Sequence, residues 1–110
     1  MGNLITLAPE TLAHTLASSP RGLLLLFSAT WCGPCRSYKP IVERVVDDTD
    51  DAVRLLVVDT DTSADIAAHY GVRSVPTLLC FRDGELVGQQ TGAMPESRLR
   101  TALGNLGLPA

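Results

Sequence analysis

Two short segments are apolar along almost their whole length, and they limit the possible folds more than any other feature of the sequence. Residues 23–27 (LLLLF) are apolar at every position, as expected for a strand that is buried on both faces. Residues 53–58 are predicted as a second strand of this kind. Because such strands need helices on both faces of their sheet, the two segments predict an α/β fold.

Helical periodicity fills the intervals between these strands. One helix is predicted to begin at Pro9, and a longer one to run over residues 35–49 with a stripe of apolar side chains on one face. Thr62 and Asp65 have the spacing of a capping box, which predicts a short third helix that Gly71 ends. Strands and helices therefore alternate through the first two thirds of the chain.

The last third has a different pattern. Residues 77–81 and 86–89 are predicted as strands on either side of Asp83-Gly84, a pair that favours a tight hairpin turn. A final helix is predicted to begin at Pro95. With residues 4–6 as a further short strand, we expect a central mixed β-sheet of about five strands flanked by about four helices.

Composition sets limits on the class of protein. The 110 residues suit one domain, residues 1–110, and the 45% hydrophobic and 19% charged residues are ordinary for a globular protein. The net charge of −3, with scattered basic residues, argues against a nucleic-acid partner. The apolar run at residues 23–27 is too short to span a membrane, which takes about 20 residues. We expect a cytoplasmic protein with no membrane association.

The most informative stretch for chemistry is "ATWCGPCRSYKP", which places Cys32 and Cys35 three positions apart. A metal pair, a structural disulfide and a reactive dithiol could share this spacing. If a helix begins between the cysteines, with Pro34 in its first turn, its positive end favours a thiolate at Cys32. Cys35 then lies one turn inside and is expected to be more shielded, which suits a resolving thiol.

Other sites have simpler interpretations. A zinc site takes about four ligands, whereas this chain has three cysteines and two histidines at unsuitable spacings, so no metal is expected. Cys80 falls within a predicted strand and is expected to be a small core residue. His14 and His69 lie on predicted helices and are expected to face solvent.

The order of several motifs resembles the thioredoxin family over essentially the whole chain. The motifs are "WCGPC" after an apolar strand, "SVPTLLCFRDGE" about forty residues later, and then "TGA". The resemblance implies a thioredoxin fold and a thiol–disulfide oxidoreductase that reduces disulfides in target proteins. Cys32 would attack, a mixed disulfide would form, and Cys35 would resolve it.

The resemblance also implies a cis peptide bond at Val75–Pro76 and a groove that binds extended segments of partners. The groove residues would be Trp31, Gly33, Pro34, Val75, Pro76, Gly92 and Ala93. No bound cofactor is implied. Electrons would come from NADPH through a thioredoxin reductase, the other partners would be disulfide-containing proteins, and the chain would be a monomer.

One departure from the family lies behind the dithiol. Members usually have a buried Asp at the position of Leu26 and a Lys at the position of Val57, a pair thought to help move the proton of the buried thiol. Both residues are apolar here, so the usual proton route is in doubt, and Asp59 or solvent remain as acceptors.

Two alternative functions remain open. The groove could serve a chaperone-like binding module, and glutaredoxin is a rival within the enzyme class, although CGPC differs from its usual CPYC.

Overall fold

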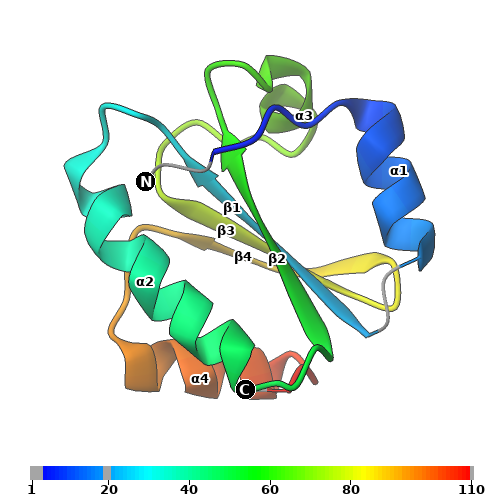
Figure 1. The fold of residues 1–110 in the computed structure, drawn as a ribbon, viewed down its shortest axis with the longest axis vertical. Coiled ribbons are helices and arrows are strands. Elements are labelled where there is room, and N and C mark those ends of the chain that lie inside the picture. Colours follow the sequence, from blue (N-terminus) through cyan, green and yellow to red (C-terminus); the bar gives the residue numbers. More distant parts are fainter. Residues whose placement is uncertain (1–3, 19–20, 110) are drawn as a thin grey trace.

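The computed structural model describes residues 4–18 and 21–109, which form a β-sheet with helices on both faces (Figure 1). The strands are β1 Gly22–Ser28, β2 Val53–Asp59, β3 Thr77–Arg82 and β4 Glu85–Thr91. The helices are α1 Pro9–Ser18, α2 Gly33–Asp47, α3 Ala64–His69 and α4 Glu96–Asn105. The predicted α/β class is confirmed.

The sheet is mixed, as predicted, with the strand order β2-β1-β3-β4. Strand β1 runs parallel to β2 and antiparallel to β3, and β4 is antiparallel to β3. The carboxyl ends of β1 and β2 therefore lie at the same edge of the sheet, where α2 begins. This edge carries the cysteine pair.

The predicted fifth strand at residues 4–6 is reduced to a single bridge. The Ile5 N–H donates to the Val57 carbonyl at 2.9 Å, and the Ile5 carbonyl accepts from the Asp59 N–H at 2.8 Å. Two residues later the Leu7 N–H donates to the Ser63 hydroxyl at 2.9 Å instead of to β2. The chain thus leaves the sheet too early to form a ladder, and the described sheet has four strands.

Both faces of β1 are covered, which explains its unbroken apolar sequence. Leu24 and Leu26 point into the core beneath α2 and α4. Leu23, Leu25 and Phe27 point into the core beneath α1 and α3. Figure 1 shows these two pairs of helices on opposite sides of the sheet. Alternate side chains of one strand therefore supply both cores, and all seven residues of β1 are buried.

The hairpin between β3 and β4 turns at the predicted pair. Asp83 and Gly84 have φ values of 52° and 86°, the left-handed geometry that both central residues of a type I′ turn require. Arg82 and Glu85 pair directly across this turn. The Asp-Gly pair is favoured here because glycine adopts positive φ without steric cost.

The predicted capping box of α3 is wrong. The helix begins at Ala64, and its N-cap Ser63 makes no side-chain cap hydrogen bond. The Ser63 hydroxyl accepts from the Leu7 N–H, and the Thr62 hydroxyl hydrogen-bonds that of Thr6 at 2.6 Å. These hydroxyls hold the N-terminal segment against the start of α3.

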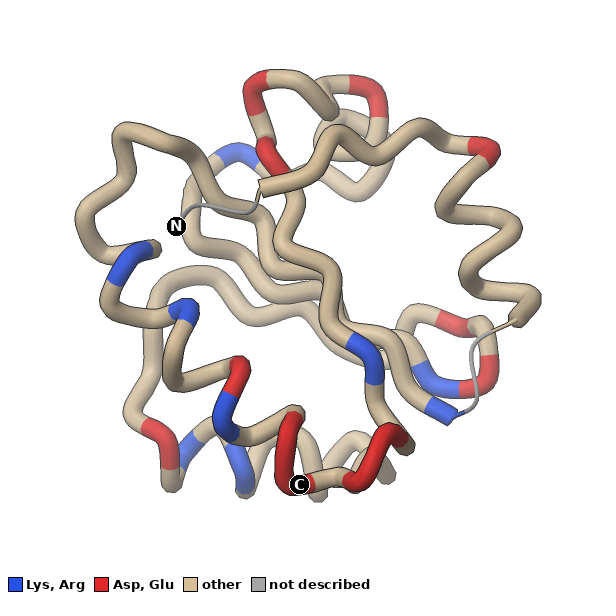
Figure 2. Tube along the Cα trace, in the orientation of Figure 1, with Lys and Arg blue, Asp and Glu red and all other residues tan. Residues whose placement is uncertain are grey.

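Ion pairs join α2 to α4 at the surface. Arg44 contacts Glu96 at 3.0 Å, and Arg100 contacts Glu96 at 2.8 Å and Asp48 at 2.7 Å. Hydrogen bonds from Arg100 and then Arg44 lower the pKa of Glu96 below its usual value. Figure 2 shows basic positions spread over several elements and interspersed with acidic ones. Within the described residues, no helix is both long and apolar enough to cross a bilayer.

Replacement by alanine is expected to change the stability of the protein in opposite directions at two glycines near the end of the chain. Gly107 has φ +78°, and a methyl group there would meet the Arg82 guanidinium, which donates to the Leu106 carbonyl at 2.7 Å. Gly107→Ala is expected to lower the free energy of unfolding by about 1–2 kcal/mol. Gly104 lies inside α4 with open space around it, so Gly104→Ala should raise stability by about 0.5–1 kcal/mol.

Urea denaturation of the two variants and the wild type measures this contrast. A Gly107→Ala protein as stable as the wild type would contradict the left-handed conformation at this position.

Candidate active site

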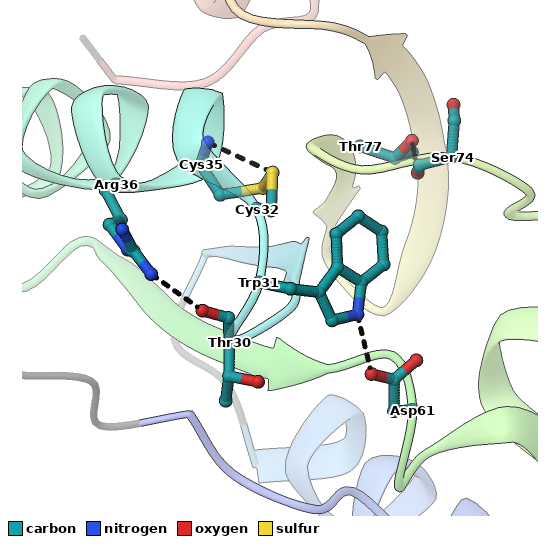
Figure 3. The surroundings of a disulfide bond; sticks show 8 residues. All are labelled: Thr30, Trp31, Cys32, Cys35, Arg36, Asp61, Ser74 and Thr77. Carbon is teal, nitrogen blue, oxygen red and sulfur yellow. Dashed lines mark hydrogen bonds between the residues drawn. A yellow bond between two sulfur atoms is a disulfide. The ribbon is translucent and has the colours of Figure 1, made fainter.

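The cysteine pair lies at the beginning of α2, directly after the central strand β1. Cys32 is the N-cap residue, with an extended backbone at φ −91° and ψ 109°, and its N–H donates to the Ala29 carbonyl at 3.1 Å. The Cys35 N–H donates to Cys32 Sγ at 3.2 Å (Figure 3). Pro34 occupies the first turn, where a missing N–H breaks no helical hydrogen bond. The Cys32 sulfur is therefore the side-chain cap of this helix.

Cys32 and Cys35 form a disulfide, with their Cα atoms 5.4 Å apart. Once the bond is reduced, a sulfur in the Cys32 position faces the positive end of the helix, which favours its thiolate. The exposed fractions are 4% for Cys32 and 2% for Cys35. The expected difference in shielding is thus small, and the cap position is the feature that distinguishes the two sulfurs.

Trp31 precedes the pair and is the most exposed large apolar side chain described, at 68%. Its indole N–H donates to Asp61 Oδ2 at 2.9 Å (Figure 3). The Asp61 N–H donates to Asp59 Oδ1 at 2.9 Å. Asp61 was missed by the sequence analysis. Its place just after β2, at the edge where β1 also ends, is the signal that could have found it, because parallel strands bring their carboxyl ends together.

A second loop faces the pair. The Val75–Pro76 peptide bond is cis, and Val75 packs against Ala29, Cys32 and Cys35. The Pro76 carbonyl accepts from the Gly92 N–H at 2.8 Å. The Thr77 hydroxyl donates to the Ser74 carbonyl at 2.8 Å and closes the same loop (Figure 3).

The remaining groove residues are placed less closely. Gly33 and Pro34 are exposed in the first turn of α2, and a methyl group at Gly33 would meet no described atom within 4 Å. Gly92 has φ +87° and is also open on its side-chain side. Ala93 is exposed next to Gly92. Among the predicted groove residues, Val75 therefore packs against the cysteine pair, and Gly92 is hydrogen-bonded to Pro76.

The protein interior behind the pair is apolar. Leu26 and Val57 are neighbours across β1 and β2, with exposed fractions of 0% and 8%. They share a core with Tyr38, whose hydroxyl finds no hydrogen-bond partner among the described residues and whose pKa is raised by burial, and then by Cys80, to about 12. Burial likewise raises the pKa of the Cys80 thiol to about 12. Cys80 is the core residue that the sequence predicted.

The histidines lie on helices and face solvent, as predicted, at His14 on α1 and His69 on α3. His69 packs edge-on against Tyr70 with ring centroids 4.7 Å apart. Across residues 4–18 and 21–109, no three His, Cys, Asp or Glu side chains gather in a way that could hold a metal ion.

Comparisons with known proteins agree with this geometry. The family model described as "Thioredoxin" matches residues 3–105. A thioredoxin from Porphyra purpurea is 41% identical over 81 residues, which cover 74% of this chain and 76% of that protein. Thioredoxin 1 from Synechococcus elongatus is 38% identical over 93 residues, covering 84% of this chain and 87% of that one.

A solved structure extends the match to the fold. A mutant thioredoxin from Halobacterium salinarum superposes with a TM-score of 0.82 at 33% sequence identity. The aligned region covers 94% of this chain and 88% of that one.

Proposed function

The chain belongs to the thioredoxin family, and from this premise we propose how its dithiol works, what it reduces and what reduces it. It is a thiol–disulfide oxidoreductase that acts on proteins, and Cys32 and Cys35 are its redox-active pair. The observation that carries the function is the position of this disulfide at the first turn of α2, in a chain that matches the family along most of its length.

Cys32 is the nucleophile in this proposal. Its sulfur already accepts a hydrogen bond from the Cys35 N–H at the positive end of α2, so the environment that stabilises a thiolate is in place before the substrate arrives. The thiolate attacks one sulfur of a target disulfide and forms a mixed disulfide. Cys35 then attacks Cys32 and releases the target in reduced form.

Target proteins bind as extended segments across the groove around the sulfurs. Two features support this proposal: the exposed indole of Trp31, which Asp61 holds in place, and the open backbone of Gly33 and Gly92. The proposed groove comprises Trp31, Gly33, Pro34, Val75, Pro76, Gly92 and Ala93. Small residues here would let a partner's backbone approach the disulfide closely.

The electron source in this proposal is NADPH, delivered through a thioredoxin reductase, with no cofactor bound to the chain itself. The proposed setting is the cytoplasm, where thiols are kept reduced, and the proposed working form is a monomer.

Reduction of insulin tests the proposal. With NADPH and a thioredoxin reductase, the protein is expected to oxidise NADPH in step with cleavage of insulin disulfides. If the protein accelerates insulin reduction beyond the rate with dithiothreitol alone, but has no activity with any reductase tried, the electron route is rejected and the dithiol chemistry is kept. If the protein accelerates insulin reduction with neither electron source, the groove serves binding alone and the function proposed here is wrong.

A further inference from the structure

The Cys35 thiol must lose its proton before it can resolve a mixed disulfide, and the described core behind it offers no carboxylate. Leu26 and Val57 are apolar and buried there. An apolar environment disfavours a thiolate, as the raised pKa of Cys80 in the same core illustrates. The resolving step therefore needs another way to stabilise the charge on Cys35.

A hollow of about 450 Å³, here called the Cys35 hollow, opens on the other side of this residue. One wall is the side of α2 that carries Cys35, Arg36, Lys39 and Glu43. The opposite wall, which includes Leu4 and residues 28–30, contributes no titratable side chain. The volume is ample for several water molecules, each of which occupies about 30 Å³ in the liquid.

Helical spacing aligns the charged residues of this hollow with the sulfur. Cys35, Lys39 and Glu43 are each four positions apart on α2, so they follow one another along a single side of the helix. Lys39 Nζ lies 3.0 Å from Glu43 Oε2, and the Lys39 side chain is only 24% exposed. The Lys39 side chain thus starts one helical turn from Cys35, and its ammonium group is paired with Glu43 and partly shielded from solvent.

The neighbouring cation, Arg36, is hydrogen-bonded to the opposite wall of the same hollow. The Arg36 guanidinium donates to the Thr30 carbonyl at 3.0 Å, across the mouth of the first turn (Figure 3). Lys39 differs from Arg36 in following Cys35 by four positions, the spacing at which side chains on a helix are neighbours, whereas side chains at adjacent positions do not face each other.

The other titratable groups near the pair do not line the hollow. Asp59 and Asp61, at the end of β2, are joined to each other and to the Trp31 indole. Tyr38 and Cys80 lie in the core, and burial raises the pKa of both to about 12, so both stay neutral at physiological pH. Of the two cations that line the hollow, Lys39 is the one placed four residues after Cys35, where its charge would favour a thiolate from the side that water reaches.

Resting on the function proposed above, we propose that Lys39 assists the resolving step: its ammonium, held by Glu43 in the Cys35 hollow, stabilises the Cys35 thiolate. Water in the hollow takes the thiol proton. The thiolate attacks Cys32 Sγ and forms the Cys32–Cys35 disulfide, while the bond between Cys32 and the target sulfur breaks. The target leaves as a thiolate and takes a proton from solvent, so two electrons pass from the dithiol to the target.

Alkylation of Cys35 tests the electrostatic part directly. In a Cys32→Ser background, the rate of iodoacetamide labelling at Cys35, located by peptide mass spectrometry, is followed as a function of pH. Lys39→Met, or Lys39→Gln as a second charge-free variant, is expected to raise the titration midpoint by about one pH unit. Lys39→Arg should keep the original midpoint.

Two control variants define the outcome. Arg98→Gln removes the same charge from an exposed site on α4 and is expected to leave the midpoint unchanged. Glu43→Gln removes a negative charge from the hollow and keeps an oxygen that can accept from Lys39, so the midpoint should not rise. A rise in Glu43→Gln would assign the role to the carboxylate and overturn the proposal, as would equal midpoints for Lys39→Met and Arg98→Gln.

Single-turnover reaction with Ellman's reagent separates the resolving step from the first attack. Thionitrobenzoate released first reports attack by Cys32, and the second release reports attack by Cys35. At pH values below the titration midpoint of Cys35, Lys39→Met should slow the second release of thionitrobenzoate about tenfold and leave the rate of the first release unchanged.

Failure of this inference and failure of the proposed function are distinguishable. A wild-type protein that does not reduce insulin would contradict the function whatever the alkylation shows. Normal insulin reduction with an unchanged Cys35 midpoint in Lys39→Met would reject only the role of Lys39.

Discussion

The Cys35→Ser variant is expected to accumulate as a mixed disulfide between Cys32 and its protein substrate, and its turnover in insulin reduction should fall to background. The reason is that Cys32 keeps the cap position that favours its thiolate, while the sulfur that would release the target is absent. Non-reducing electrophoresis and mass spectrometry of the trapped species measure this result.

Two further variants complete the experiment. Cys32→Ser should also abolish turnover but trap no substrate, since the nucleophile is lost. Cys80→Ala should retain turnover, because Cys80 is fully buried in the core and is absent from the redox pair. Trapping through Cys35 in the Cys32→Ser variant would reverse the assignment of roles.

The Leu26→Asp variant is expected to lose much of its stability, by an amount that depends on pH. Leu26 is completely buried, so loss of its packing costs about 2–5 kcal/mol at every pH. The introduced carboxyl would lie among apolar side chains opposite Val57, and burial would raise its pKa above the unfolded value of about 3.9.

The sign of the pH dependence follows from this raised pKa. The unfolded chain gives up the proton first, so the ionisation penalty is absent below the unfolded pKa. It grows by about 1.4 kcal/mol per pH unit as pH rises toward the folded pKa, and it is constant above that value. The variant should therefore be most stable, relative to wild type, under acidic conditions.

Urea denaturation of Leu26→Asp and Leu26→Asn, from about pH 4 to about pH 8, separates the cost of ionising the introduced carboxyl from the cost of the lost packing. The Asn variant carries the polar group without the charge, so its difference from wild type should be nearly independent of pH. A parallel pH dependence in the two variants would show that position 26 is hydrated or close to a cation, and the description of a dry core behind Cys35 would be wrong.

The elements that the sequence predicted well are those determined by neighbouring residues. Five consecutive apolar residues in β1 indicated burial on both faces, and Asp83-Gly84 indicated the hairpin, because each signal acts within a few positions. Pro34 and the spacing of Cys32 and Cys35 indicated the start of α2 and the cap position of the first cysteine.

The features that sequence reasoning missed depend on residues far apart in the chain. Thr62 and Ser63 have hydroxyls suited to a helix cap, but these groups bond to Thr6 and Leu7, which are 56 positions away. The same contact ends the predicted first strand after Ile5. The Lys39–Glu43 pair is visible as a common helical spacing, but its relation to the hollow beside Cys35 needs the opposite wall formed by residues 28–30.

The single bridge at Ile5 also limits the edge that β2 offers to a strand of another molecule. Strand β2 lies at one border of the described sheet, where unpaired backbone groups can recruit a strand from another molecule. The backbone of Ile5 hydrogen-bonds the Val57 carbonyl and the Asp59 N–H, so these two groups are not free to pair with another strand. The exposed Arg54 lies toward the opposite end of β2. With the Ile5 bridge at one end and the charge of Arg54 at the other, β2 does not present a long, flat edge on which a fibril could begin to grow.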